Sequence, residues 1–205
     1  MRPDPDQALL NRWRAGGAED RRAAFDELYR RYHRKVYSTA RHVTGDSNAA
    51  ADVTQETFLQ VFEKFDTFES RSSFSSWLYR IAVNCAGEHR RKHRKNPVPL
   101  PGAAATPRTD GQAAELERDR RRPDAGDPAG ETSGEVQDAL QQLSPKLRTV
   151  VVLRYVEGLS YEEVAEVLAC SVGTVKSRLN RAHEALEQWL APARGAAKDA
   201  STRGM

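Results

Sequence analysis

The chain has 205 residues, of which 30% are charged and 39% are hydrophobic, and its formal net charge is +3. This composition is typical of soluble helical proteins, and no apolar run approaches the roughly 20 residues that span a bilayer. The start of the chain lacks the apolar core of a signal peptide, and Cys85 and Cys170 do not have the spacing of a metal site. We therefore expect a cytoplasmic protein without membrane insertion, metal or cofactor, whose cysteines are free thiols.

The positive charge is concentrated in the first half of the chain. Residues 21–95 contain 15 Lys and Arg against 9 Asp and Glu, and the run HRRKHRK at 89–95 holds much of the excess. Such a block is either a solvated helix end or a surface that binds a polyanion. Charge alone does not choose between the two.

Composition also divides the chain into parts. Residues 1–95 and 135–190 carry helical periodicity, whereas 96–134 are rich in Pro, Gly, Ala, Asp and Arg and have almost no large apolar side chains. We predict a flexible linker at 96–134 and a disordered tail at 191–205. No strand pattern competes, so the predicted fold class is all-α, with two helical domains joined by the linker.

Four helices are predicted in the first domain. A short one around Leu9, Leu10 and Trp13 ends near Gly16, and a long one with its apolar face between residues 25 and 43 ends at Gly45. Ser47 is a candidate N-cap for the third helix. The apolar stripe of the third helix consists of Phe58, Val61, Phe62 and Phe65. A polar turn at 68–73 precedes the fourth helix, whose stripe includes Phe74, Trp77, Leu78, Ile81 and Cys85 and which ends in the basic run. We expect Trp77 to be a core residue because it lies in the middle of that stripe.

The second domain has the pattern of a helix-turn-helix. Ser144 and Pro145 begin a helix that Gly158 ends, and Ser160 with Glu163 forms a capping box at the start of the next one. That short helix, 161–168, is followed by a three-residue turn and by a helix that starts near Val172. A turn of this length holds two helices at a steep angle.

The second helix of this motif presents a polar face near its start. When Val175 and Leu179 pack inward, four side chains that hydrogen-bond to base edges and phosphates are left outward: Lys176, Ser177, Asn180 and Arg181. The alternative interpretation is an ordinary helical hairpin with a solvated polar face. The capping box, the short turn and this set of side chains favour DNA binding.

Three segments resemble the extracytoplasmic-function (ECF) sigma factors of the sigma-70 family. Residues 159–186, LSYEEVAEVLACSVGTVKSRLNRAHEAL, resemble region 4, residues 52–65 resemble region 2.2, and residues 74–91 resemble regions 2.3 and 2.4. The chain is identified as a member of this family because two independent motifs occur in the expected order. The resemblance implies an RNA polymerase sigma factor that has no catalytic site. A conventional helix-turn-helix regulator is the alternative.

The resemblance also implies which residues carry the function. The face that would dock on the β′ clamp helices of core polymerase is formed by Asp52, Gln55, Glu56 and Glu63. The residues that would read and melt the minus-ten element, with one base flipped out and held, are Asn84, Arg80, Phe68, Ser72, Ser73, Arg90 and Arg91. The residues that would bind the minus-thirty-five element are Arg154, Lys176, Ser177, Asn180 and Arg181. The implied partners are core RNA polymerase, through its β′ clamp helices and β flap, promoter DNA, and an anti-sigma factor.

Two positions in the second domain depart from the pattern of the family. Lys176 stands where many relatives have arginine, and lysine lacks the bidentate fork that pairs with guanine. Asn180 stands where some relatives have a bulky apolar residue. We therefore expect the preferred promoter sequence to differ from that of these relatives.

Overall fold

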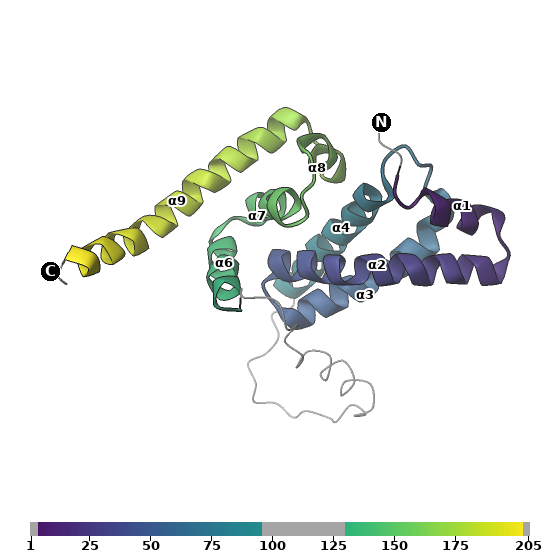
Figure 1. Cartoon of the computed structure of the whole chain (residues 1–205), viewed down its shortest axis with the longest axis horizontal. Helices are drawn as coiled ribbons and strands as arrows, with labels where there is room; N and C mark the ends of the chain where they lie inside the picture. The colour runs from purple at the N-terminus through teal and green to yellow at the C-terminus, as the bar shows by residue number, and fades with distance from the viewer. Residues whose placement is uncertain (1–3, 96–129, 203–205) are drawn as a thin grey trace, which may run out of the picture.

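The computed structural model describes residues 4–95 and 130–202, with side chains described at 4–93 and 134–190. Within these ranges every regular element is helical, which confirms the predicted fold class (Figure 1). The N-terminal module (residues 4–95) comprises α1 (Gln7–Ala15), α2 (Ala18–Thr44), α3 (Ser47–Lys64), η1 (Phe65–Thr67) and α4 (Phe74–Lys95). The C-terminal module (residues 130–202) comprises α6 (Gly130–Gln142), α7 (Pro145–Val151), η2 (Val152–Val156), α8 (Tyr161–Val167) and α9 (Val172–Thr202). The predicted linker falls outside the described residues up to 129, and α6 begins five residues before the predicted boundary at 135.

In the N-terminal module, α2 and α3 lie side by side and α4 packs against both (Figure 1). Gly45 ends α2 with φ +84°, a left-handed conformation that glycine adopts without steric cost. The cap of α3 is Asp46 and not the predicted Ser47, because the Asp46 carboxylate accepts a hydrogen bond of 2.7 Å from the Ala49 amide. Both residues are good caps, and the extended backbone of Asp46 decides between them.

Aromatic rings fill the core of this module where η1 leads into α4. Phe74 is 0% exposed, and its ring centroid lies 5.6–5.9 Å from those of Tyr32, Phe65, Phe68 and Trp77. Trp77 is half-buried among these rings, as predicted for a core residue. Phe62 is different. The sequence predicts it in the apolar stripe of α3, but it is 55% exposed, and its ring meets those of Trp13 and Phe25 edge to face at 5.6 and 5.2 Å between centroids. A helix face that is wider than the surface packed against it leaves its margin in solvent.

The C-terminal module contains the predicted helix-turn-helix. Ser160 Oγ accepts from the Glu163 amide at 3.2 Å and the Glu163 carboxylate accepts from the Ser160 amide at 2.7 Å, which confirms the capping box. Val164 on α8 and Val175 and Leu179 on α9 are buried together. Ala169 turns the chain with φ +47°, and hydrogen bonds from Cys170 N to Ala165 O and from Ala169 N to Glu166 O close the end of α8.

The passage from α7 to α8 contains a π-helical turn that periodicity did not predict. In η2 the Glu157 amide donates to Val152 O at 3.1 Å, five residues back, and Gly158 then ends the helix with φ +71°. Such turns insert one extra residue into a helix and often mark functional positions. Here the turn places Arg154 and Glu157 on different surfaces of the module.

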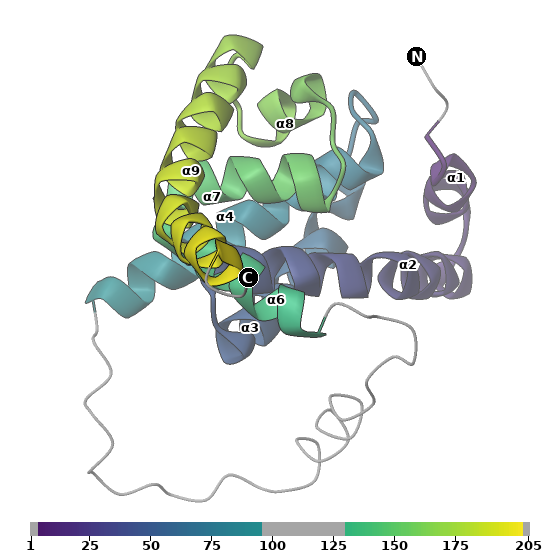
Figure 2. The same ribbon diagram turned by 60° about the vertical axis from the view of Figure 1, so that its left-hand side comes forward.

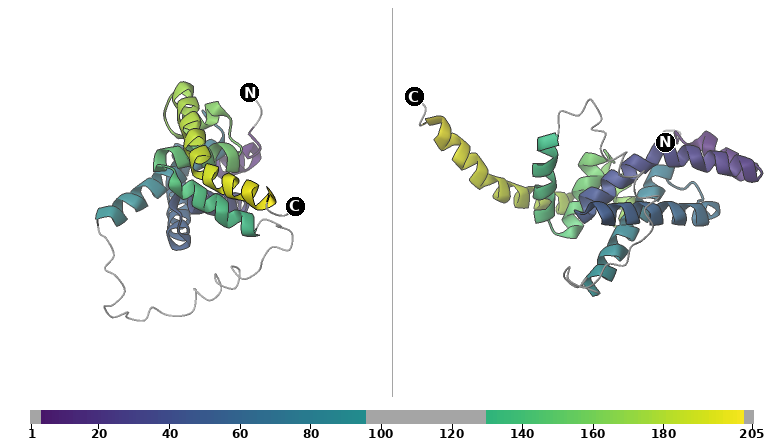
Figure 3. Two further views of the ribbon diagram at one scale, coloured as in Figure 1. Left: turned by 90° about the vertical axis from the view of Figure 1, so that its left-hand side faces the viewer. Right: turned by 90° about the horizontal axis from the view of Figure 1, so that it is seen from below.

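α9 continues past residue 190, where the predicted tail begins. The helix extends to Thr202, away from the other helices (Figure 3), and residues 203–205 lie outside the described residues. Adding residues to an existing helix costs much less than nucleating one, and five of residues 191–202 are alanine, which favours helix, although the segment also contains Pro192 and Gly195, which do not.

The two modules pack against each other along α4. Figure 2 shows α7 and α8 beside α4, and Tyr79 and Val83 of α4 share the apolar core of the C-terminal module. Val43, at the end of α2, packs against the cores of both modules.

Candidate nucleic-acid and polymerase interfaces

The start of α9 exposes the predicted DNA-reading residues. Lys176, Ser177, Asn180 and Arg181 are all exposed, while Val175 and Leu179 between them are buried. Ser171 Oγ accepts from the Thr174 amide at 3.2 Å and so caps the helix just before these residues. The spacing places all four polar side chains on the solvent-facing side of a helix whose other side is buried. A recognition helix reads a major groove with such a face.

Arg154 lies beside this face although it comes from η2. Its guanidinium carbon lies 5.0 Å from the centre of the Tyr161 ring and its Nη1 donates to Leu159 O at 2.8 Å. The ammonium group of Lys176 lies 5.9 Å from the centre of the same ring. Tyr161 therefore joins Arg154 to the α9 residues in one continuous surface. Sequence reasoning did not single out this tyrosine.

The predicted minus-ten residues do not all lie at the surface. Asn84, Arg90 and Arg91 on α4 are exposed. Ser72 and Ser73 are half-buried, and Ser73 Oγ caps α4 by accepting from the Ser76 amide at 3.1 Å.

Phe68 requires a correction as a direct contact residue. Its side chain is only 4% exposed, and its ring packs 5.1 Å from that of Trp77. From sequence alone, an aromatic residue in a polar turn can either contact a ligand or pack into the core. In this structure the Phe68 ring packs into the core. Phe68 anchors the turn from inside the core and does not present its ring to a ligand.

Arg80 is occupied by the C-terminal module. Its Nη2 donates to Glu166 O on α8 at 2.7 Å and lies 3.8 Å from the Glu166 carboxylate, and its Nε is buried without a hydrogen-bond partner. The structure thus separates the predicted minus-ten residues into an exposed set around Asn84 and one arginine beneath α8.

The predicted polymerase-binding residues form one exposed face of α3. Asp52, Gln55, Glu56 and Glu63 are exposed, whereas Val53 and Val61 on the other side of the helix are in the core. Two large apolar side chains, Leu59 at 53% and Phe62 at 55%, are exposed within the same face. An acidic surface with exposed apolar side chains is suited to a basic, partly apolar helix of another protein.

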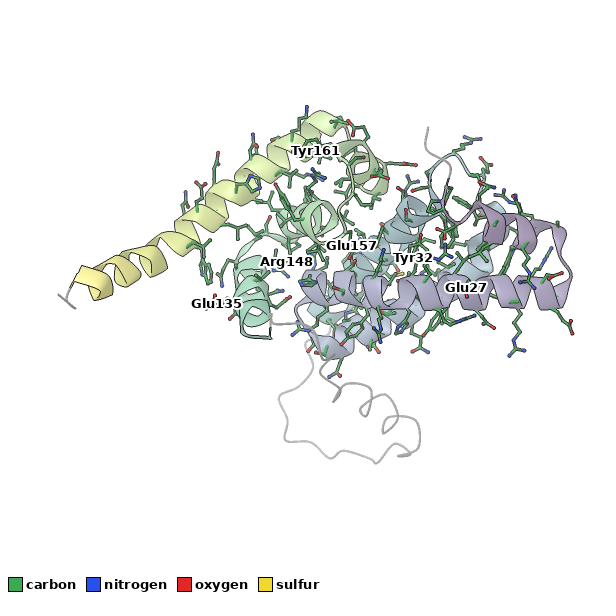
Figure 4. All side chains as sticks on the ribbon, viewed as in Figure 1. Glu27, Tyr32, Glu135, Arg148, Glu157 and Tyr161 are labelled. Atoms are coloured by element: carbon green, nitrogen blue, oxygen red, sulfur yellow. The ribbon has the colours of Figure 1, made fainter. Side chains whose placement is uncertain are left out.

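Glu157 holds the modules together. Its carboxylate accepts hydrogen bonds from Thr39 Oγ1 on α2 and from the Tyr79 hydroxyl on α4 (Figure 4). Two glutamines of α6 also hydrogen-bond to α2. Gln137 Nε2 donates to Arg41 O and Gln141 Nε2 donates to His42 O, each at 3.3 Å. Glu157 directly precedes Gly158 in the sequence, and its position gave no sign of these distant partners.

Tyr79 makes the stability of this packing depend on alkaline pH. Burial, and then the charge of Glu157, raises the pKa of the Tyr79 hydroxyl above its ordinary value of 10.0. The contribution of this hydroxyl to stability is complete below about pH 10 and is lost as the pH rises further. Above pH 10 the tyrosine loses its proton in the unfolded chain but keeps it in the folded one, so the free energy of unfolding falls by up to about 1.4 kcal/mol per pH unit. We expect urea unfolding to give a lower free energy at pH 11 than at pH 8, with a smaller difference in Tyr79→Phe. Identical pH dependence in the two proteins would contradict this.

The described part of the chain lacks two kinds of feature. Its helices include none with an apolar stretch long enough to cross a bilayer. Its His, Cys, Asp and Glu side chains include no group of three or more that is placed to hold a metal ion.

Comparison with known proteins places this geometry in a family. The family model of sigma-70 region 2 matches residues 28–96 and that of sigma-70 region 4 matches residues 133–186. The RNA polymerase sigma-H factor of Pseudomonas aeruginosa is 36% identical over 92% of the chain and 95% of its own length. The ECF RNA polymerase sigma-E factor of Haemophilus influenzae is 36% identical over 91% of the chain and 96% of its own length.

Solved structures agree with these matches. CnrH in complex with the cytosolic domain of CnrY superposes with a TM-score of 0.62 at 26% identity, over 91% of this chain and 97% of that one. The sigma factor RpoE of Bartonella quintana, in complex with the anti-sigma factor NepR, gives a TM-score of 0.58 at 26% identity, over 82% and 96%. The chain belongs to the ECF group of the sigma-70 family of RNA polymerase sigma factors.

Proposed function

We propose that this chain directs core RNA polymerase to its own set of promoters and acts by binding alone, as a cytoplasmic initiation factor without enzymatic activity. The observation that carries the proposal is the separation of three exposed surfaces on one chain. These are the acidic face of α3, the face of α4 around Asn84, and the start of α9. A conventional regulator needs only the last of the three.

Each surface has one partner in this proposal. Asp52, Gln55, Glu56 and Glu63 bind the β′ clamp helices of core polymerase, and the C-terminal module binds the β flap. Asn84, Arg90, Arg91 and the turn at 68–73 hold the minus-ten strand, and Arg80 joins them once α8 has left it. Lys176, Ser177, Asn180, Arg181 and Arg154 bind the minus-thirty-five duplex. Phosphate contacts by the arginines set the register, and contacts to base edges provide the specificity.

An anti-sigma factor is a further proposed partner. One structural relative, RpoE of Bartonella quintana, was solved with a protein named as an anti-sigma factor. The exposed apolar residues Leu59 and Phe62 offer a surface that such a protein would cover.

Transcription in a purified system tests the function. The chain and its cognate core polymerase are incubated with fragmented genomic DNA, and the 5′ ends of the transcripts are sequenced. We expect transcripts that start at a fixed distance downstream of a shared two-part sequence motif. Transcripts that appear only when a second sigma factor is added would show that the chain is a regulator instead.

The major-groove role of Lys176 gives a first prediction. Lys176→Ala is expected to weaken binding of the holoenzyme to a cognate promoter duplex about five- to tenfold, the lower part of the range for a base contact, because lysine makes no bidentate pair. Titration against random-sequence DNA is the comparison, and Lys146→Ala, an exposed lysine on α7, is the matched control. Equal losses on cognate and random DNA would assign Lys176 to a phosphate.

The base-holding role of Asn84 gives a second prediction. Extruding a base costs a few kcal/mol of stacking, which contacts in a protein pocket must recover. Asn84→Ala is expected to lower the permanganate reactivity of the melted promoter roughly tenfold, the equivalent of ~1.4 kcal/mol, while the holoenzyme still binds the closed duplex. Asn48→Ala, an exposed asparagine on α3, is the control. Unchanged permanganate reactivity in Asn84→Ala would remove this role.

A further inference from the structure

The turn between η1 and α4 adopts an unusual conformation and makes few contacts within itself. Ser70 has φ +54°, in the left-handed region that a residue with a Cβ rarely adopts. Residues 69–72 make no backbone–backbone hydrogen bond with any other described residue, since the neighbouring bonds are from Phe68 N to Phe65 O and from Trp77 N to Ser73 O. Within the turn Arg71 Nε pairs with the Glu69 carboxylate at 2.6 Å, but both side chains are exposed, so the buried support for the turn comes from elsewhere in the chain.

Arg14, at the end of α1, provides that support. Its Nη2 donates to Phe68 O at 2.6 Å and to Ser70 Oγ at 2.9 Å, and its guanidinium lies 5.9 Å from the centre of the Phe68 ring. Hydrogen bonds from a charged donor are stronger than those from a neutral one. One side chain thus holds Ser70, which adopts the unusual backbone conformation, and Phe68, which lies two residues before it.

Other residues at the N-terminus hold the two ends of the same segment. Trp13 Nε1 donates to Asp66 Oδ1 at 3.0 Å, and the Trp13 ring stacks on Phe65 with centroids 4.1 Å apart. At the far end, Asp4 Oδ2 accepts from the Phe74 amide at 2.7 Å. Asp4, Trp13 and Arg14 all precede residue 28, where the match to the region 2 family model begins.

We propose that Arg14 is a positioning residue for minus-ten recognition. It touches no DNA itself, but it holds the turn 68–73 in the shape that receives the extruded base, so that the N-terminal helix takes part in promoter opening. This inference rests on the proposed function, since it assumes that the turn receives that base. A turn held in place before binding gives up less conformational freedom when the base arrives.

The test compares two arginines of the same helix. Arg14→Met keeps the aliphatic part of the side chain and removes its donors. Arg12→Met is the matched control, because Arg12 makes only an exposed ion pair with Asp20, at 2.9 Å. Arg14→Lys restores a charged donor and is expected to recover part of the loss.

Two measurements distinguish positioning from general stability. In the full chain, hydrogen–deuterium exchange of the Phe68 and Trp77 amides, which are hydrogen-bonded on either side of the turn, is expected to accelerate about tenfold in Arg14→Met and to stay unchanged in Arg12→Met. In the holoenzyme, the preference for a single-stranded minus-ten oligonucleotide over its scrambled version is expected to fall roughly tenfold, while affinity for the minus-thirty-five duplex stays within about twofold of the original. A variant that merely unfolds would lose both affinities together.

The outcomes also separate this inference from the function on which it rests. The inference is overturned if Arg14→Met leaves the Phe68 and Trp77 amides as slow to exchange as Arg12→Met does. It is equally overturned if Asn84→Ala loses the minus-ten preference and Arg14→Met retains it. If both variants retain the preference, the assignment of minus-ten recognition to this face fails first.

Discussion

Truncation of Phe74 to alanine is expected to lower the free energy of unfolding of the N-terminal module by about 3–5 kcal/mol. Phe74 is fully buried, and four aromatic rings surround it. Its removal takes away the transfer free energy of the ring and leaves a cavity that stiff aromatic neighbours cannot close. Because Phe74 is the first residue of α4, the turn that precedes it should loosen as well.

Urea unfolding followed by tryptophan fluorescence measures the effect, since Trp77 lies against the deleted ring. Phe62→Ala is the matched control: the same atoms are removed from a residue that is 55% exposed, and a loss of about 1 kcal/mol or less is expected. Equal losses in the two variants would show that the ring cluster around Phe74 is not the centre of the core.

Replacement of Arg148 by methionine is expected to cost about 3 kcal/mol or more, because it leaves several carbonyl groups without a partner. The Arg148 side chain donates to Leu140 O at 2.8 Å, Gln141 O at 3.0 Å and Leu143 O at 3.2 Å, at the end of α6. It also donates to Val43 O at 2.9 Å, near the end of α2 (Figure 4). The last carbonyls of a helix have no partner within the helix, so one buried guanidinium caps helices of both modules.

The pKa of the Arg148 guanidinium is lowered by burial and, secondarily, by the charge of Arg90. Methionine has a similar length but no donors. Lys146→Met, at an exposed position of the same helix, is the control and should change the free energy of unfolding by less than about 0.5 kcal/mol. If Arg148→Met proves as stable as Lys146→Met, solvent must satisfy these carbonyls in the folded protein.

Sequence patterns predicted most of this fold because they report which side of a helix is buried. The capping box at Ser160 and the left-handed glycine at 45 are local signals, and both were read correctly. The exposed residues of α9 followed from the burial of Val175 and Leu179. Phe62 was predicted in the buried stripe because a helical period gives a direction around an axis but not the width of the surface that covers it. Phe68 lies in a turn, where no helical period applies, and its predicted role came from the resemblance to the family.

The contacts that were missed are those between distant parts of the chain. Arg148 lies three residues before Val151 and four before Val152, which already places it on the buried face of its helix, and this was the one available signal. The partners of Glu157 are 118 and 78 residues away along the chain. Arg14 reaches a turn more than 50 residues further on. No local pattern specifies partners at such separations, because they depend on how the helices pack.

Because Arg80 contacts Glu166, the packing of α8 on α4 competes with the binding of nucleic acid at Arg80. The Arg80 guanidinium donates to a peptide carbonyl of α8 and lies near the Glu166 carboxylate, so a phosphate that approaches the same nitrogen must compete with both groups. We therefore expect nucleic acid to bind Arg80 more tightly in molecules whose modules have separated, so that its apparent affinity there falls as the fraction of closed molecules rises. Any protein that pulls α8 away from α4 would tighten that binding without touching the nucleic acid, and by the same linkage nucleic acid bound there would keep the two modules apart.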